Sequence, residues 1–116
     1  MNKRQIGKEK EELACRFLEE KGYQILEKNY QCRSGEIDVI AKEGSYLCFI
    51  EVKYRKNKSM GYAQEAIHKN KQHKIIQVSR YYLYTHGCLA STPCRFDAVV
   101  INYDQIELIK NAFMGF

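Results

Sequence analysis

Hydrophobic residues recur along this chain at two spacings, and these spacings divide it into helices and strands. A helical spacing runs over residues 4–21, and its apolar face consists of Ile6, Leu13, Ala14, Phe17 and Leu18. Gly22 follows as a helix stop. A second, longer helix is predicted over residues 63–85. β-rich runs predict five strands, over residues 23–27, 35–42, 45–54, 95–103 and 105–110.

The predicted order of elements is αβββαββ. Glu43 and Gly44 separate the second and third strands as a hairpin turn, and Asp104 separates the last two. The strand over 45–54, the long helix and the strand over 96–101 predict a right-handed crossover between parallel strands. Neither a repeat nor a linker interrupts the pattern, so we expect a single domain over residues 1–116.

Composition narrows the class of protein. No apolar run approaches the roughly 18 residues that span a bilayer, and the N-terminal residues are too charged for a secretory signal. We therefore expect a cytoplasmic protein without a membrane partner. The net charge of +5 permits a polyanionic partner. Five cysteines without a CxxC pair argue against structural zinc and disulfides, and they predict free thiols with Cys48 in the core.

Acidic residues on the two central strands carry the first candidate chemistry. Side chains alternate between the faces of a strand, so Asp38 and Glu51 lie on one face of the predicted hairpin. A turn centred on Glu43 and Gly44 would place Asp38 opposite Phe49, one diagonal step from Glu51. Diagonal neighbours are roughly 7 Å apart, which lets two carboxylates share one cation.

Carboxylates on an apolar face repel each other and lose hydration, so they need positive charge nearby. Lys53, two residues after Glu51, provides one such charge. A divalent cation would provide the rest, and oxygen ligands suit Mg²⁺ or Mn²⁺ better than zinc. Acids, a lysine and a hard cation together suit phosphodiester hydrolysis. The alternative is a solvated face on which Glu51 and Lys53 form an ordinary surface ion pair.

Both predicted helices add candidates. On the first helix Glu11 lies at the edge of the apolar face and can look inward, whereas Glu12 points nearly opposite. The inward side of the second helix carries Gln64 and Lys71. Lys71 either faces the site or lays its stem over apolar surface, and Gln64 is either a ligand or a polar residue of the helix N-terminus.

Several linked sequence blocks resemble one protein family over essentially the whole chain. The blocks GEIDVIA, FIEVKYR, GYAQEAIHKNK, RFDAVV and IELIKNAF resemble the uncharacterised bacterial YraN family. That family is similar to archaeal Holliday-junction resolvases and, by that likeness, to the restriction-endonuclease-like superfamily. The resemblance implies an α/β fold with a restriction-endonuclease-like core, in which a mixed five-stranded sheet is flanked by helices.

The same resemblance assigns roles to residues of the site. It implies that Asp38, Glu51, Lys53 and Glu11 are catalytic, and that Asp38, Glu51 and Glu11 hold the metal. Lys10 departs from the family, which usually has a glycine at this position.

A basic segment follows the presumed active strand and predicts a nucleic-acid partner. The residues expected to bind nucleic acid are Arg55, Lys56, Lys58, Lys71 and Gln64. The leading hypothesis is a metal-dependent endonuclease that acts on DNA rather than RNA and recognises structure rather than sequence. The alternative is a non-catalytic nucleic-acid-binding module that keeps the nuclease fold. A third hypothesis is a homodimer formed through the apolar residues 112–116, which can equally be ordinary packing.

Overall fold

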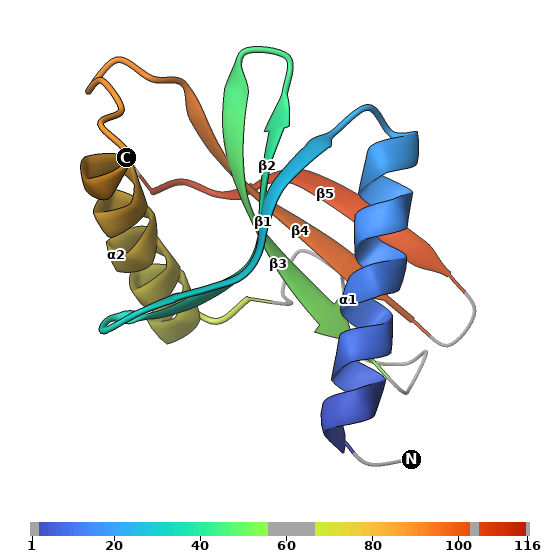
Figure 1. The fold of residues 1–116 in the computed structure, drawn as a ribbon. Coiled ribbons are helices and arrows are strands. Elements are labelled where there is room, and N and C mark those ends of the chain that lie inside the picture. Colours follow the sequence, from blue (N-terminus) through green and yellow to red (C-terminus); the bar gives the residue numbers. More distant parts are fainter. Residues whose placement is uncertain (1–2, 56–66, 103–104, 116) are drawn as a thin grey trace.

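The structure is a computed structural model that describes residues 3–55, 67–102 and 105–115. The described residues form two helices and five strands in the predicted order (Figure 1). Their bounds are α1 Lys3–Glu20, β1 Gln24–Cys32, β2 Gly35–Glu43, β3 Tyr46–Tyr54, α2 Lys69–Thr85, β4 Cys94–Ile101 and β5 Ile106–Phe113.

The strands form one mixed sheet in the order β1-β2-β3-β4-β5. β3 and β4 pair in parallel, as the predicted crossover requires, and the other neighbours pair antiparallel. The helices lie on opposite sides of the sheet (Figure 1). The result is the α/β fold with the element order that the sequence predicts.

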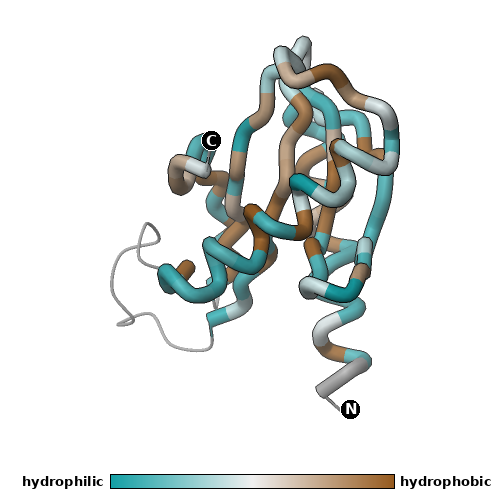
Figure 2. Tube along the Cα trace, turned by 90° about the vertical axis from the view of Figure 1, so that its left-hand side faces the viewer, coloured by the Kyte–Doolittle hydropathy of each residue, from teal (hydrophilic) through white to brown (hydrophobic). Residues whose placement is uncertain are grey.

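Each helix closes its own apolar core against the sheet. The core under α1 includes Ala14, Leu18, Val39, Ile50 and Val99. The core under α2 includes Ile75, Val78, Phe49, Phe96 and Val100. The central strands are buried on both faces, and their tube is correspondingly brown in Figure 2. The helical spacing of apolar residues predicted the buried face of α1, because burial of apolar surface favours apolar residues at the positions that face the core. Gly22 ends this helix with a φ of 96°.

β1 and α2 differ in their bounds from the predicted elements. β1 extends to Cys32 because it pairs with β2 along a hairpin that closes at Cys32 and Gly35. α2 begins at Lys69 because His68 has an extended backbone with ψ of 156°, so Ile67 precedes the helix and is buried there. Residues 63–66 of the predicted helix lie outside the described residues.

The register of β2 and β3 corrects the prediction by two residues. Ile40, rather than Asp38, lies opposite Phe49, because Glu43 pairs with Tyr46 and the turn is at residues 44–45. Gly44 takes a φ of 58°, which favours glycine at this turn. A shift of two residues preserves the faces of the strands.

β2 bends away from β3 at Asp38. The ladder between the two strands ends at Val39 and Ile50, although β2 continues to pair with β1. Ile37 and Ile40 enter the same core, so the strict alternation predicted for this strand is interrupted between them. The end of the β1–β2 hairpin swings toward α2 (Figure 1), where Tyr30 packs edge-on against Tyr82 with ring centroids 5.2 Å apart.

A second set of charges lies under α1, around the fully buried Asp97. Its carboxylate accepts hydrogen bonds from the Tyr23 hydroxyl at 2.8 Å, the Arg95 Nε at 2.9 Å and the Asn111 amide at 2.9 Å. Arg95 also pairs with Glu43. Asn111, with a φ of 56°, sits where β5 bulges opposite β4. The network therefore ties β4 to the bulge, to the end of α1 and to the β2–β3 turn.

β5 ends later than predicted, at Phe113, whose ring stacks on Phe96 at 4.8 Å. Phe113 is thus ordinary core packing, while Met114 is exposed and homodimer formation stays a prediction.

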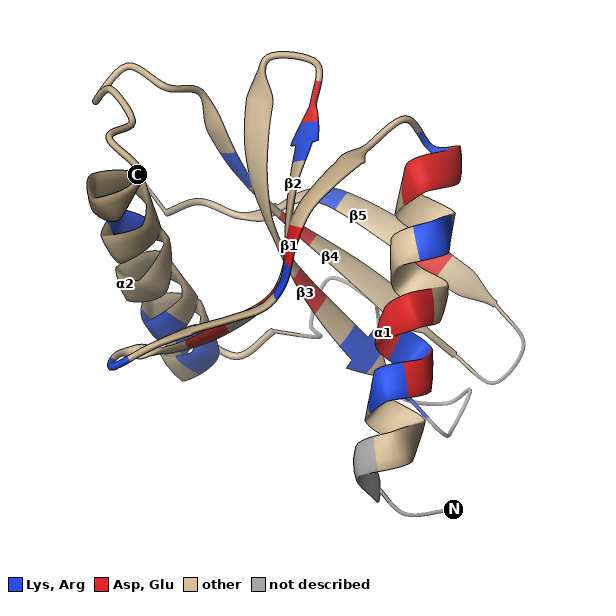
Figure 3. Cartoon of the chain, in the orientation of Figure 1, with Lys and Arg blue, Asp and Glu red and all other residues tan. Residues whose placement is uncertain are grey.

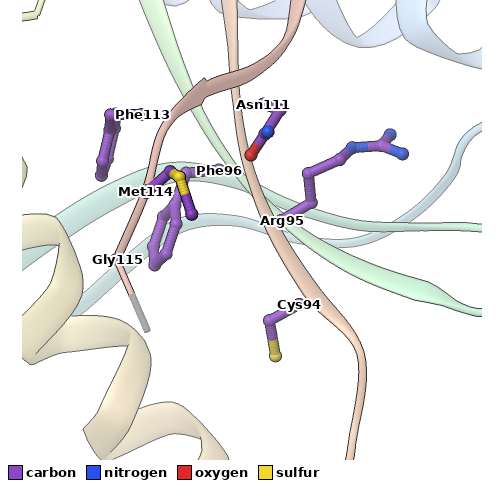
Figure 4. A pocket seen from close by; sticks show the side chains of 7 residues that line it. All are labelled: Cys94, Arg95, Phe96, Asn111, Phe113, Met114 and Gly115. Atoms are coloured by element: carbon purple, nitrogen blue, oxygen red, sulfur yellow. The ribbon is translucent and has the colours of Figure 1, made fainter.

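A cavity of about 100 Å³ lies beside these rings, and Arg95 points away from it (Figure 4). Its lining contains no acidic residue, so it has no part in the predicted chemistry.

Two predictions about the class of protein can be compared with the structure. In the described part of the chain, neither helix is long and apolar enough to cross a membrane. The five cysteines are free, and Cys48 is fully buried, as predicted.

Candidate active site

The structure brings Asp38 and Glu51 together where β2 leaves β3. The Val52 amide donates a hydrogen bond of 2.8 Å to Oδ2 of Asp38. The carboxyl groups of Asp38 and Glu51 also lie close enough to share a proton, which one of them must carry for a hydrogen bond to form. We call these two residues the acid pair. The observed register explains their closeness. Asp38 and Glu51 are the next residues after Val39 and Ile50, the last pair of the β2–β3 ladder.

The acid pair is electrostatically unfavourable in isolation. Burial, followed by repulsion from Asp38, raises the pKa of Glu51 to about 8. Burial also raises the pKa of Asp38, although the hydrogen bonds from Val52 and Glu51 oppose this rise. Glu51 is only 6% exposed, and its Oε2 atom is buried without a hydrogen-bond partner. An orphaned buried carboxylate oxygen is rare, because leaving it unpaired costs free energy.

Lys71, in the first turn of α2, is the cation that directly contacts the acid pair. Its Nζ lies 3.8 Å from Oε1 of Glu51. Its charge lowers the pKa of both Asp38 and Glu51, against the larger effect of burial. Lys53, which is half-buried on β3, acts on Glu51 more weakly. The sequence emphasised Lys53 because it follows Glu51 at a strand spacing, whereas the approach of Lys71 depends on how α2 packs.

Glu11 looks inward from α1, and Glu12 is exposed, as the helical wheel predicts. Burial, followed by repulsion from Asp38, raises the pKa of Glu11. A hydrogen bond from the Asn29 side chain opposes this rise. Asn29 has a φ of 52°, a conformation that asparagine tolerates well, and sequence analysis did not single it out. The signal that could have pointed to Asn29 is that asparagine tolerates the left-handed backbone conformation and here lies inside a strand.

The unusual Lys10 has a packing partner in the structure. Its Nζ lies 4.7 Å from the centre of the Tyr54 ring, a distance at which a cation is attracted to an aromatic face. This contact explains how a lysine is accommodated near the apolar side of α1. It also holds positive charge close to the end of β3.

The remaining predicted nucleic-acid contacts are only partly described. Lys56, Lys58 and Gln64 lie outside the described residues. Arg55 is half-buried, and its amide donates to the Ile101 carbonyl, which continues the pairing of β3 with β4. Figure 3 shows lysines and arginines at the end of β3 and on the N-terminal parts of both helices.

The donor set limits which metal the site could hold. Among residues 3–55, 67–102 and 105–115, no three histidine, cysteine or acidic side chains gather as a metal cluster. The structure offers two carboxylates, with Glu11 nearby and bonded to Asn29. Mg²⁺ is commonly held by one or two carboxylates while it retains water. The acid pair and its orphaned oxygen fit such an ion, and they do not fit a fully ligated zinc site.

These features define an α/β protein with a mixed five-stranded sheet and an acid pair at the edge of its two central strands. The chain belongs to the uncharacterised protein family UPF0102, whose family model matches residues 10–101. This is the family that the sequence blocks predict.

Three bacterial relatives show how far the similarity extends. The UPF0102 protein of Lachnoclostridium phytofermentans is 52% identical over 113 residues, which cover 97% of this chain and 96% of the relative. That of Syntrophus aciditrophicus is 46% identical, covering 92% and 87%. That of Aeromonas hydrophila is 44% identical, covering 92% and 83%. The similarity therefore extends over most of the chain.

Proposed function

We propose that the protein is a metal-dependent endonuclease that hydrolyses DNA phosphodiester bonds, with Mg²⁺ or Mn²⁺ held by the acid pair. One observation carries the proposal: two carboxylates lie together, that of Asp38 half-buried and that of Glu51 buried, and one oxygen of Glu51 has no hydrogen-bond partner. A purely structural pair would be expected to satisfy its oxygens or to face solvent. A divalent cation would neutralise both carboxylates and occupy the unpaired oxygen.

The neighbouring residues can then be given roles in the reaction. The acid pair orients the cation, and Glu11 supports it from α1. Lys53 stabilises negative charge that develops on the phosphoryl group, because a fixed ammonium is most effective in a partly buried site. The chemistry that a divalent ion supplies in such a site is Lewis-acid polarisation of the phosphoryl oxygen.

The proposed partner is nucleic acid, with DNA preferred over RNA. The net charge of +5 and the lysines around the acid pair favour a phosphate backbone. Arg55, Lys71, Lys56, Lys58 and Gln64 are the proposed contacts. No element of the described chain is set out as a recognition helix for a DNA groove, so selectivity for nucleic-acid structure is the simpler proposal. A cytoplasmic location belongs to the same proposal.

The decisive experiment combines metal binding with cleavage. Purified protein is titrated with Mn²⁺ by calorimetry and then incubated with branched, single-stranded and duplex DNA. We expect binding of Mn²⁺ and metal-dependent nicking, both of which Asp38→Ala and Glu51→Ala abolish. Equal cleavage by these variants would assign the activity to a contaminant. Salt-sensitive DNA binding without Mn²⁺ binding or cleavage would instead support the non-catalytic binding module.

The two adjacent glutamates of α1 provide a matched test of the third acid. Glu11→Gln is expected to weaken Mn²⁺ binding about tenfold, because it removes a negative charge close to the acid pair. Glu12→Gln removes an equal charge from the exposed side and should change the affinity much less. Calorimetry on both variants makes the comparison, and equal effects would show that Glu11 has no special relation to the metal.

A further inference from the structure

Lys71 contacts Glu51, and its proposed role as a nucleic-acid contact does not explain this ion pair. The acid pair is expected to draw its positive charge from Lys53 and a metal ion. Among the described residues, the ammonium that forms an ion pair with Glu51 is that of Lys71, on a different element. Lysine in the first turn of a helix is unfavourable, because the positive end of the helix dipole lies there. The acid pair is the compensating charge.

The contact between Lys71 and Glu51 has a geometry that allows a metal ion to replace the ammonium. The separation of 3.8 Å is longer than the 2.7–3.2 Å or so of a hydrogen bond, so the two groups attract each other without a directed bond. The Lys71 side chain is 34% exposed, whereas that of Glu51 is 7% exposed. The lysine can therefore turn toward solvent while the glutamate stays in place. Oε2 of Glu51 remains without a partner even with Lys71 present.

We propose that Lys71 is a positioning residue that neutralises the acid pair in the metal-free protein and is displaced when a divalent cation binds. The inference rests on the proposed function, because it assumes that the acid pair is a metal site. In the metal-free state the ammonium attracts the negative charge of the acid pair. In the metal-loaded state the same ammonium faces a site that is nearly neutral, so most of this attraction is lost. Displacement of Lys71 therefore reduces the affinity for the metal. In the metal-free protein, the same ammonium offsets the repulsion between Asp38 and Glu51.

Removing the charge of Lys71 is expected to strengthen Mn²⁺ binding, whereas removing the charge of Glu11 is expected to weaken it. Lys71→Met keeps most of the aliphatic stem and removes the charge, so Mn²⁺ should bind roughly tenfold more tightly than to the wild-type protein. The metal-free variant should also melt at a lower temperature, and Mn²⁺ should raise its melting temperature more than it does for the wild type. Lys71→Arg retains the charge and should bind Mn²⁺ as the wild type does.

Lys69 provides the control, because it lies in the same first turn of α2 and is exposed. Lys69→Met removes the same unfavourable interaction with the helix dipole, and its Mn²⁺ affinity should stay within about twofold of the wild type. In a Glu51→Gln background, Lys71→Met should no longer lower the melting temperature, because its partner charge is gone.

Calorimetry with Mn²⁺ and thermal unfolding separate the outcomes. If the wild type binds Mn²⁺ through the acid pair but Lys71→Met matches Lys69→Met or binds more weakly, the displacement of Lys71 is wrong and the metal site stands. If the wild type does not bind Mn²⁺ at all, the proposed function fails, and this inference fails with it.

Discussion

Replacing Glu51 by glutamine is expected to stabilise the metal-free protein at neutral and alkaline pH and to abolish the proposed metal-dependent activity. Glu51 is buried beside Asp38, which disfavours its ionised form, and one of its oxygens has no hydrogen-bond partner. Glutamine has nearly the same shape and carries no charge, so the repulsion disappears. We expect a gain of about 1–2 kcal/mol in the free energy of unfolding at pH 8. Cleavage should fall by roughly a thousandfold, because the acid pair can no longer hold the cation.

The pH dependence of this gain follows from the direction of the pKa shift. The pKa of Glu51 is raised to about 8 in the folded protein, against about 4.3 in an unfolded chain. A raised pKa means that the native state binds the proton more tightly than the unfolded state does. Its contribution to stability is therefore complete below about pH 4 and is lost as the pH rises toward 8. The advantage of Glu51→Gln should be small at pH 5 and largest at pH 8.

Urea unfolding of the wild-type and variant proteins at several pH values, in the presence of a chelator, measures this difference. Glu107→Gln, on the exposed side of β5, is the matched control and should show no such pH dependence. If Glu51→Gln is instead destabilising at pH 8, the attraction to Lys71 outweighs burial and repulsion from Asp38, and the electrostatic cost assigned to the metal-free acid pair is wrong.

The second large effect is expected at Asp97 on β4, which pairs with Ile50 next to Glu51 but faces the opposite side of the sheet, toward Tyr23. Asp97→Ala removes a fully buried carboxylate and leaves three donors without an acceptor, from Tyr23, Arg95 and Asn111. The Arg95 charge stays largely buried, with Glu43 as its remaining partner. Breaking a buried ion pair at one partner costs about 3–5 kcal/mol, a large part of the stability of a domain of this size.

Two milder variants test the same network if Asp97→Ala does not fold. Tyr23→Phe removes two hydrogen bonds, one donated to Asp97 and one accepted from Arg95, and should cost about 1–2 kcal/mol. Lys110→Met breaks the half-exposed pair between Lys110 and Glu43 and should cost less than about 1 kcal/mol. Urea unfolding gives these values in one series. A loss below about 1 kcal/mol for Asp97→Ala would show that the network does not stabilise the fold.

Local pattern was sufficient for most of the fold. The apolar stripe of α1 and the inward position of Glu11 follow from helical geometry alone, and both agree with the structure. Strand lengths and register agreed less well. The turn at Gly44 was placed one residue early, and β1 was ended at residue 27 instead of Cys32. Both depend on pairing with a neighbouring strand, which a single segment of sequence does not encode.

The candidate site shows the same division. Strand alternation placed Asp38 and Glu51 on one face, and the observed shift of two residues leaves that parity unchanged. The bend of β2, the hydrogen bond from the Val52 amide to Asp38 and the hydrogen bond from Asn29 to Glu11 were not predicted. Each joins residues from different elements, so none leaves a periodic signal in the chain.

The sequence by itself determined the element order, the apolar face of α1 and the residue types that can hold a hard cation, because burial and alternation are local and periodic. Only the tertiary structure decided which ammonium accompanies the carboxylates. Lys71 comes from a helix that packs across the sheet, and its distance from Glu51 is set by that packing. The burial of Glu51 is likewise a property of the assembled layers, because a single strand cannot exclude water from its own side chains.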